Sequence, residues 1–328
     1  MTATIQGIGI IGCGLIGTKR ARSLPSSCRL IAVHDTNRAS AETLISEIGS
    51  GEVVDSIDEV IRDERIDVVI VATAHSSLAS IALGAVENGK HVLIEKPGAR
   101  NADELSAVKI AAEISGRRVR VGFNHRFHPA MLLAHKLINS GAYGDLLWIR
   151  GRYGHGGRIG YDREWRAIKD VSGGGELLDQ GSHLIDLTRF FFGDVSMTYA
   201  HLTTAFWDME VEDNAFLQLQ PECGGTAWLH ASWTEWKNTF SLEITLKTAK
   251  IDISGLGGSY GRESLTLYEM QPEMGPPPSQ TWSWEEGDRS WDLEMEDVLA
   301  DVHGAKSVGA TIDDALATLD IIGKAYAS

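Results

Sequence analysis

The chain has 328 residues, of which 43% are hydrophobic and 23% charged, so it is long enough for two globular domains and too apolar for intrinsic disorder. Its formal net charge of −15 argues against binding to nucleic acids, whose phosphates would be repelled. No apolar run approaches the roughly 20 residues that a membrane-spanning helix needs.

Up to residue 123, short apolar segments alternate with amphipathic ones. Strands buried on both faces are predicted by β-branched, almost continuously apolar segments at 5–12, 29–35, 67–73, 91–97 and 118–124. Helices are predicted between them, several with Ser, Thr or Asn at the start and Gly at the end, at 15–24, 38–49, 56–64, 77–89 and 101–116. The alternation predicts an α/β fold over residues 1–123, with a doubly wound parallel sheet of the Rossmann type.

After Asn124 this alternation stops, and all nine tryptophans follow residue 147. Consecutive strands are predicted at 146–154, 195–207, 211–220, 225–234, 240–255 and 263–270. Helices are expected at 129–141, 176–193 and about 311–326, and a loop at 273–280, where proline cannot join a ladder. Residues 124–328 are therefore expected to form an α+β domain with a large, mainly antiparallel open sheet; the last helix either stays with it or packs back toward the first domain.

The acidic side chains are concentrated in this second part of the chain. Residues 1–122 carry 15 acidic and 14 basic side chains, whereas residues 123–328 carry 30 and 16. The three cysteines, Cys13, Cys28 and Cys223, are widely spaced, which predicts neither a disulfide framework nor a zinc site. The first residues lack the pattern of a signal peptide, so a cytoplasmic protein is expected.

A glycine motif, GCGLIG, follows the first predicted strand and opens the first predicted helix. It has the G-x-G-x-x-G spacing of dinucleotide-binding loops: Gly12 permits a tight turn, Gly14 lets the backbone approach a pyrophosphate, and Gly17 lets helix and strand pack closely. The helix N-terminus, with Leu15 and Ile16, supplies N–H groups to the phosphates. A tight turn without a ligand is the alternative.

Asp35 ends the second predicted strand, 18 residues beyond Gly17. A carboxylate at this place binds the adenosine ribose hydroxyls and repels a 2′-phosphate, which favours NAD over NADP. Arg38 keeps NADP as an alternative, because a nearby arginine holds that phosphate.

The segment HVLIEKP places Glu95 and Lys96 at the carboxyl end of a buried strand, where ligands bind in open α/β sheets. A lysine there stabilises negative charge that develops on a substrate oxygen. A solvated lysine at a strand end is the alternative.

Residues 173–183, GGGELLDQGSH, place three glycines before a predicted helix that carries Asp179 and His183 four residues apart, hence on one helical face. We predict that the glycines allow a close backbone approach to the cofactor and the neighbouring domain. A histidine suits proton transfer near neutral pH. The alternatives are a structural pair at a domain interface and a metal site formed by His125, His128 and His183; these histidines have no defined metal-ligand spacing, so no metal is expected.

Residues 151–167 are rich in glycine, arginine and aromatic residues, which suits a loop that binds sugars, carboxylates or phosphates. The several cations in it favour an anionic substrate such as a nucleotide-linked sugar, whereas a solvated loop is the alternative. The candidate substrate-binding residues here and in the segment GFNHRFHPA are His155, Arg158, Tyr161, Trp165, Arg166, Asn124 and Arg126.

Together, GCGLIG, EKP and GGGELLDQGSH resemble the glucose–fructose oxidoreductase, inositol dehydrogenase and rhizopine-catabolism family, Gfo/Idh/MocA, and occur in that family's order. The resemblance covers nearly the whole chain. It implies a nicotinamide cofactor, a sugar, sugar derivative or cyclitol as substrate, and a homodimer or homotetramer formed through the open sheet face.

The resemblance also implies roles for particular residues. Its catalytic lysine, aspartate and histidine fall on Lys96, Asp179 and His183, and its cofactor-binding set includes Glu95 and the loop residues Thr73, Ala74 and His75. That loop, ATAHSSLA, departs from the ATPNxxH pattern of many relatives, which puts in doubt the contacts of the side chains that differ. The sequence thus predicts an NAD-dependent dehydrogenase; the alternatives are an NADPH-dependent keto-sugar reductase and a non-catalytic NAD-binding regulatory protein.

Overall fold

The chain divides into two compact units that do not follow the sequence order strictly. The computed structural model describes residues 6–222 and 224–328. Unit 1 contains the chain up to Asn124 together with Trp291–Ala317, and unit 2 contains His125–Ser290 and Thr318–Ser328. Residues 291–317, expected in the second domain, belong to unit 1 by their contacts.

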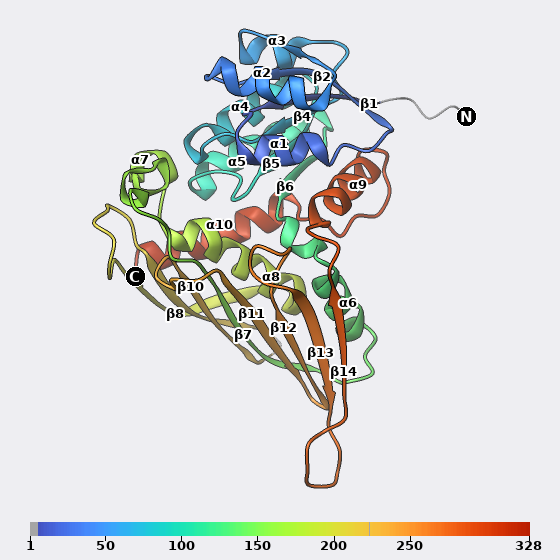
Figure 1. The fold of residues 1–328 in the computed structure, drawn as a ribbon, viewed down its shortest axis with the longest axis vertical. Coiled ribbons are helices and arrows are strands. Elements are labelled where there is room, and N and C mark those ends of the chain that lie inside the picture. The colour runs from blue at the N-terminus through green and yellow to red at the C-terminus, as the bar shows by residue number, and fades with distance from the viewer. Residues whose placement is uncertain (1–5, 223) are drawn as a thin grey trace. The chain divides into compact units, whose positions relative to one another are not determined.

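Unit 1 is built on a parallel sheet of six strands (Figure 1). The strands run in the order β3-β2-β1-β4-β5-β6, with bounds β1 Gln6–Ile11, β2 Cys28–His34, β3 Glu52–Val53, β4 Val68–Val71, β5 His91–Glu95 and β6 Val119–Gly122. The strand order reverses between β1 and β4, and in sheets of this kind ligands bind beyond the carboxyl ends of the strands at that reversal. The prediction of a doubly wound parallel sheet is confirmed, although the short strand β3 was not predicted.

The helices of unit 1 form two groups. Helix α1 contacts α2, whereas α3 contacts α4 and α4 contacts α5; their bounds are α1 Leu15–Arg22, α2 Arg38–Ile48, α3 Ile57–Arg62, α4 His75–Glu87 and α5 Ala102–Ser115. Capping defines several ends. The side chains of Ser56 and Asn101 accept hydrogen bonds from backbone N–H groups in the first turns of α3 and α5, and Gly49 and Gly116 end α2 and α5 in the left-handed conformation.

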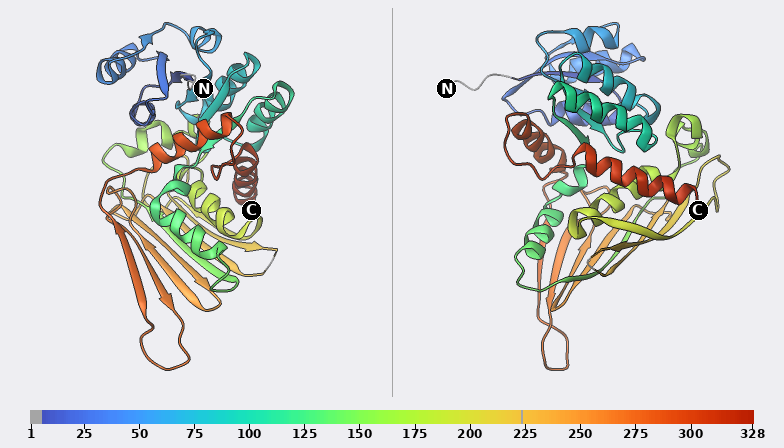
Figure 2. Two further views of the ribbon diagram at one scale, coloured as in Figure 1. Left: turned by 90° about the vertical axis from the view of Figure 1, so that its right-hand side faces the viewer. Right: turned by 180° about the vertical axis from the view of Figure 1, so that it is seen from behind.

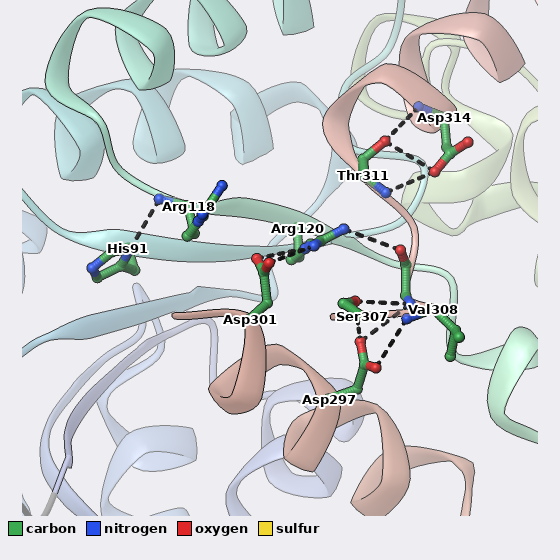
Figure 3. A network of polar contacts seen from close by, with 10 residues as sticks. His91, Arg118, Arg120, Asp297, Asp301, Ser307, Val308, Thr311 and Asp314 are labelled. Atoms are coloured by element: carbon green, nitrogen blue, oxygen red, sulfur yellow. Dashed lines mark hydrogen bonds and ion pairs between the residues drawn. The ribbon is translucent and has the colours of Figure 1, made fainter. Parts of the chain in front are cut away.

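A segment from the far end of the chain completes unit 1. Helix α9, Ser290–Val302, was not predicted; its Met295, Val298 and Leu299 join the apolar cluster that contains Ile8 and Ile10 of β1. Figure 3 shows the polar contacts that hold this segment, in which Arg120 of β6 pairs with Asp301. Thr311 forms an antiparallel bridge to Arg120, so the segment extends the edge of the sheet. Long-range packing of this kind leaves no local sequence signal.

Unit 2 is built on an eight-stranded sheet that is antiparallel except where β7 pairs with β10. The order is β14-β13-β12-β11-β7-β10-β9-β8, with bounds β7 Leu146–Gly154, β8 Val195–Thr203, β9 Asn214–Pro221, β10 Thr226–Ser232, β11 Thr239–Leu246, β12 Ala249–Ser254, β13 Glu263–Glu269 and β14 Ser279–Trp284. Side chains of β11 alternate between buried and half-buried, as expected for a sheet covered on one face. This confirms the predicted mainly antiparallel sheet.

Helices cover one face of that sheet (Figure 2). Helix α6, Pro129–Asn139, contacts β13 and β14, and α8, Ser182–Phe192, contacts β7, β8 and β10. Short 3-10 turns occur at η1 Asn124–Phe127, η2 Tyr161–Arg163 and η3 Trp165–Ala167, a π-helical turn η4 spans Leu177–Gly181, and the remaining helices are α7 Lys169–Ser172 and α10 Ile312–Tyr326. Helix α10 begins in unit 1 and continues into unit 2 from Thr318.

The predicted elements of unit 2 need three changes. The segment 240–255 is a hairpin of two strands, β11 and β12, and β8 ends at Thr203, so residues 204–207 form a loop. Strand β14 was not predicted. The loop prediction at 273–280 is confirmed over most of its length, since it connects β13 to β14. Among the described residues, no helix has both the length and the apolar character that crossing a membrane requires.

Candidate functional site

The GCGLIG loop in unit 1 uses each of its glycines differently. Gly12 has φ +95°, and a Cβ on it would lie 2.4 Å from the Ala72 carbonyl oxygen. A Cβ on Gly17 would lie 1.9 Å from the Gly12 oxygen, so only glycine fits there. A Cβ on Gly14, in contrast, meets nothing within 4 Å. Packing within the chain therefore explains Gly12 and Gly17, whereas Gly14 borders open space.

Helix α1 starts directly beside that space. Gly14 is its N-cap residue and supplies no side-chain cap, Leu15 is 75% exposed, and Ile16 is half-buried. An uncapped helix N-terminus presents N–H groups and a partial positive charge, both of which suit a pyrophosphate. The loop therefore fits the diphosphate of a dinucleotide.

Asp35 and Arg38 follow β2 and bear on the choice between NAD and NADP. Asp35 is half-buried, and its two carboxylate oxygens accept hydrogen bonds from Cys13 N and Asn37 N, each at 2.7 Å. Its place beside the glycine loop fits the adenosine ribose. Exposed Arg38 already pairs with two carboxylates, Glu42 at 3.0 Å and Asp55. A 2′-phosphate would have to compete with both of these partners.

The two described cysteines, Cys13 and Cys28, are free thiols, and Cys223 lies outside the described residues. Burial, with a further contribution from the Asp35 charge, raises the pKa of Cys13 to about 12. A thiol in this state is a poor nucleophile and a poor metal ligand at neutral pH. Cys13 therefore serves the turn of the glycine loop rather than chemistry.

The loop after β4 carries three predicted cofactor-binding residues. Ala74 is the N-cap residue of α4 and supplies no side-chain cap, and Thr73 Oγ1 accepts a hydrogen bond from Ser77 Oγ at 2.9 Å. His75 is buried in the first turn of the same helix. Because this loop directly follows β4, it lies at the carboxyl end of that strand, beside the reversal in strand order.

Glu95 ends β5 inside unit 1, and half-buried Lys96 follows it. Glu95 accepts a hydrogen bond from Arg20 Nε at 2.5 Å, and Arg20 also reaches Glu294 of α9 at 2.6 Å. All three side chains are buried, and the Trp291 ring lies 4.6 Å from the Arg20 guanidinium carbon. Glu95, predicted to bind the cofactor, thus anchors the strand end that presents Lys96. Sequence reasoning missed Arg20 and Glu294, which lie 274 residues apart.

In unit 2, the three glycines before Asp179 have structural reasons of their own. Gly173 ends α7 with φ +84°. A Cβ on Gly174 would lie 2.0 Å from the Tyr326 hydroxyl, and one on Gly175 would lie 2.0 Å from the Glu212 carbonyl oxygen. Gly174 and Gly175 thus lie close to Tyr326 and Glu212 of the same unit, and the expected approach of these glycines to the cofactor stays a prediction.

Glu212 caps the helical segment that these glycines open. Its carboxylate accepts hydrogen bonds from Gly175 N at 3.1 Å, Leu177 N at 3.0 Å and the Tyr326 hydroxyl at 2.9 Å. Burial raises the pKa of Glu212, and these donors oppose the rise. Neither Glu212 nor Tyr326 belongs to a motif, so sequence reasoning missed both. Their effect is to fix the start of the segment that carries Asp179 and His183.

Asp179 lies in the π-helical turn η4 and is buried. Such turns are rare and occur often at functional sites. The Asp179 carboxylate accepts a hydrogen bond from Arg166 Nε at 3.0 Å, and the Arg166 guanidinium carbon lies 4.5 Å from the Trp165 ring centre. The structure therefore brings together three of the predicted site residues.

His183, in the first turn of α8, lies in a cluster of aromatic rings. Its imidazole stacks on that of His125, with centroids 3.6 Å apart and planes 18° apart, and the Tyr153 ring centre lies 6.1 Å away. His128 contacts His125 edge-on, with centroids 5.4 Å apart, and pairs with Glu263 at 2.8 Å. Among the described residues, no group of three or more His, Cys, Asp or Glu side chains has the geometry to hold a metal ion.

Two tyrosines near His183 were not predicted as site residues. The rings of Tyr153 and Tyr260 are 5.0 Å apart, and the Tyr260 hydroxyl accepts a hydrogen bond from Gln180 Nε2 at 2.9 Å. Burial raises the pKa of Tyr153 well above its ordinary value and that of Tyr260 to about 12. Both phenols therefore stay protonated at neutral pH.

The remaining predicted substrate residues differ in their surroundings. Asn124 is buried in unit 1. Arg126 is also buried and binds Asp186 through two hydrogen bonds, Nε–Oδ2 at 2.8 Å and Nη2–Oδ1 at 2.6 Å. These hydrogen bonds fix the Arg126 guanidinium within unit 2, its role in substrate binding stays a prediction, and Asp186 carried no signal in the sequence.

The predicted loop 151–167 is largely ordered by its own contacts. Tyr161 is buried against Trp233, and burial lowers the pKa of His155, so that its imidazole is mostly neutral at pH 7. Arg158 pairs with Glu164 at 2.6 Å. The excess of cations that the sequence suggested is therefore balanced locally by carboxylates.

Comparison with known protein families gives two matches that together span most of the chain. Residues 6–123 match the oxidoreductase family model described as an NAD-binding Rossmann fold, and residues 131–255 match the GFO/IDH/MocA C-terminal domain.

Curated proteins similar to this chain are sugar and inositol dehydrogenases. Levoglucosan dehydrogenase of Pseudarthrobacter phenanthrenivorans is 32% identical over 60% of this chain and 54% of its own length. Inositol 2-dehydrogenase 2 of Saccharopolyspora erythraea is 32% identical over 66% of this chain and 63% of its own length. The aligned part of the chain thus spans little more than half of the first relative and less than two thirds of the second.

Solved structures show the same fold over almost the whole chain. Levoglucosan dehydrogenase in complex with NADH and levoglucosan superposes with a TM-score of 0.88 at 24% identity, covering 98% of this chain and 97% of that one. An NAD-binding oxidoreductase from Klebsiella pneumoniae has a TM-score of 0.86 at 22% identity, covering 98% and 96%.

Proposed function

Since the chain belongs to the Gfo/Idh/MocA oxidoreductase family, we propose that it is a dehydrogenase that exchanges a hydride between NAD and a CH–OH carbon of a sugar, a sugar derivative or a cyclitol. The observation that carries this proposal is the glycine loop, in which Gly14 borders open space beside an uncapped helix N-terminus. Unit 1 would bind the dinucleotide, and unit 2 would bind the substrate and a second subunit. The dehydrogenase names of the similar proteins support the substrate class.

NAD is the proposed cofactor rather than NADP. Bound NAD+ would accept the hydride, which is the redox chemistry that the side chains cannot supply. Asp35 would hold the ribose hydroxyls, and the N-terminus of α1 would hold the pyrophosphate. Because Arg38 is paired with Glu42 and Asp55, we expect weaker binding of NADP+ than of NAD+ in calorimetric titrations. Tighter binding of NADP+ would instead favour the keto-sugar reductase alternative.

The proposed catalytic set is Lys96, Asp179 and His183, supported by family membership and by their positions in the family's motifs. His183 would take the hydroxyl proton, because a neutral imidazole is a suitable base near pH 7. Lys96 would stabilise negative charge on the substrate oxygen. Asp179, held by Arg166, would orient the hydroxyl group or complete a proton relay.

The test is His183→Ala assayed by the absorbance of reduced nicotinamide with a panel of sugars and cyclitols. We expect kcat to fall by about two to four orders of magnitude, with NAD+ affinity nearly unchanged. The matched control is His303→Ala, which removes an exposed histidine at the end of α9 and should leave kcat as it is. Near-normal turnover of the His183 variant would remove this residue from the proposed role.

The same panel separates an enzyme from a regulatory protein. A non-catalytic NAD-binding protein would bind NAD+ and reduce none of it with any substrate of the panel. Among the panel, neutral sugars and cyclitols are expected to be better substrates than nucleotide-linked or uronic sugars. The reason is that Arg158 and Arg166 are paired with Glu164 and Asp179.

We further propose that the open face of the unit 2 sheet pairs with a second copy of the chain, as a dimer or as part of a tetramer. Large apolar side chains are exposed on neighbouring strands there, namely Trp148 on β7, Tyr199 on β8, Phe216 on β9 and Trp228 on β10. Contiguous exposed patches of this kind mark interaction sites. Light scattering of wild type and Trp228→Glu tests this, since the variant should dissociate; an unchanged mass would contradict the proposed face.

A further inference from the structure

Two loops of unit 2 present an exposed pair of aromatic side chains. Phe206 lies between β8 and β9, and Trp236 lies between β10 and β11. Their rings meet edge to face, with centroids 4.6 Å apart, yet the side chains are 60% and 61% exposed. Neither ring therefore contributes much to the core, although aromatic side chains of this size are usually buried.

The backbone of Trp236 is strained to hold this position. Its φ of +54° is the only positive value among the described residues other than glycine. For a bulky side chain this backbone region is unfavourable, and such strain is concentrated at functional sites. Gly156 lies so close that a Cβ on it would be 2.7 Å from the Trp236 Cα. The indole of Trp236 is thus held in solvent by a strained backbone.

The loop that carries Phe206 is held firmly. Buried Asp213 accepts hydrogen bonds from the backbone N–H groups of Ala205 at 2.7 Å, Phe206 at 2.8 Å and Trp207 at 3.0 Å. The Trp207 indole also donates to the Trp233 carbonyl oxygen at 3.0 Å. The loop that presents Phe206 is therefore preorganised, which lowers the conformational entropy that this loop loses when a ligand binds.

A continuous row of aromatic rings connects the pair to Tyr161, which lies in the same loop as Arg166. Trp207 contacts both Phe206, at 5.1 Å between centroids, and Tyr161, at 5.9 Å. Tyr161 itself is buried, and Arg166, five residues further along the same loop, donates a hydrogen bond to Asp179 at 3.0 Å. The exposed pair is thus an aromatic surface at the outer end of a row of rings that begins in the loop holding Asp179.

The charges around this surface point to a neutral ligand. Arg158 pairs with Glu164, and Arg166 pairs with Asp179. Sugar rings and aryl groups present an apolar face that stacks on aromatic side chains, and neither needs a counter-charge.

We propose that Phe206 and Trp236 form an outer subsite that binds a neutral ring joined by a glycosidic bond to the sugar that is oxidised. This inference rests on the proposed dehydrogenase function and narrows its substrate class to glycosides with a second ring, either a sugar or an aryl group. The ring stacks on the aromatic pair while the oxidised sugar lies near Asp179.

The experiment compares kcat/KM for methyl glucoside, phenyl glucoside and cellobiose in wild type, Trp236→Gly and Phe206→Ala. Wild type is expected to prefer at least one ring-bearing glycoside over methyl glucoside by about tenfold, and both variants should lose this preference with the methyl glucoside value unchanged. Phenyl glucoside and cellobiose distinguish an aryl group from a second sugar. Met274→Ala is the control, because it removes a fully exposed apolar side chain from the β13–β14 loop of the same unit.

Trp236→Gly also separates binding from folding, because glycine relieves the strain. Its Tm should equal or exceed that of wild type while the preference disappears; a lower Tm with all three substrates affected equally would indicate a structural role and overturn the inference. A changed elution volume in both variants would indicate a subunit interface instead and would also overturn it.

A second readout does not depend on turnover. Calorimetric titration of phenyl glucoside and cellobiose, each with NAD+ present, should show about tenfold weaker binding of the preferred glycoside to both variants than to wild type. Equal affinity in all three proteins overturns the subsite even if the enzyme is active. If the wild-type protein oxidises none of the glycosides, but the variants bind the preferred glycoside more weakly than wild type does, the subsite is supported and the proposed dehydrogenase function is contradicted.

Discussion

The two glycine motifs of this chain contain the same residue for different reasons. In unit 1, Gly12 and Gly17 pack against backbone, whereas Gly14 borders open space beside the start of α1. In unit 2, Gly174 and Gly175 are pressed against Tyr326 and Glu212. Packing against the chain explains Gly12, Gly17, Gly174 and Gly175, whereas Gly14, which has a negative φ and no close neighbour, is left to be explained by a ligand.

The two units also differ in the carboxylate contacts of a buried arginine. Arg126 of unit 2 forms two hydrogen bonds to the carboxylate of Asp186. Arg20 of unit 1 meets two carboxylates, Glu95 and Glu294. Two ionised carboxylates around the one Arg20 guanidinium leave a negative charge in excess. Mutations can therefore separate the two kinds of site.

The largest expected effect is that of Arg126→Met, which leaves the Asp186 carboxylate buried without its guanidinium. We expect the free energy of unfolding, measured with urea, to fall by about 3–5 kcal/mol. The double variant Arg126→Met with Asp186→Leu replaces the pair by apolar side chains and should recover most of this loss. If the double variant is as unstable as the single one, the ion pair is not the cause.

Next is Gly175→Ala, whose added Cβ would lie 2.0 Å from the Glu212 carbonyl oxygen and 2.8 Å from its nitrogen. Both neighbours are backbone atoms that cannot rotate away, so we expect a loss of about 3 kcal/mol from overpacking. Differential scanning calorimetry measures the change. A Tm equal to that of wild type would show that this backbone has room to move.

A pH-dependent effect is expected at Glu294. Burial raises its pKa to about 7, with the Arg20 charge opposing the rise. In the unfolded chain a glutamate titrates near 4.3, so the folded state holds an extra proton between these values and stability falls as pH rises through that window. Above about pH 7 the loss is complete.

Glu294→Gln removes this titration. The free energy of unfolding of this variant minus that of wild type, measured with urea, should increase by on the order of 2 kcal/mol between pH 5 and pH 7.5. Wild type loses stability over this range as Glu294 ionises, whereas the variant keeps only the Arg20–Glu95 pair, which is balanced in charge. A difference that stays constant with pH would place the titration at another group.

The smallest effect on stability is expected for Gly14→Ala, which completes the comparison of the two motifs. Gly14 has φ −72° and no neighbour for a Cβ, so the free energy of unfolding should change by less than about 0.5 kcal/mol. NAD+ affinity should nevertheless fall by about tenfold, because the methyl group occupies the place of the pyrophosphate. Unchanged affinity in calorimetric titration would argue against a dinucleotide at this loop.

The sequence by itself determined the parts of the fold that depend on local pattern. Buried strands, helix caps and the G-x-G-x-x-G spacing act over a few residues, so the parallel sheet and the glycine loop followed from them. The candidates Lys96, Asp179 and His183 came from motifs, and their roles stay a prediction. Helix α9 was missed because its role depends on packing against a distant part of unit 1.

Only the tertiary structure decided which charged side chains are matched and which aromatic rings are exposed. Arg20 pairs with Glu294, which lies 274 residues away in the sequence, and Arg126 pairs with Asp186, which lies 60 residues away. The strained Trp236 meets Phe206 from another loop. Partnerships of this kind depend on distances that folding alone creates, because neither the burial of a charge nor the environment of a ring is encoded in neighbouring residues.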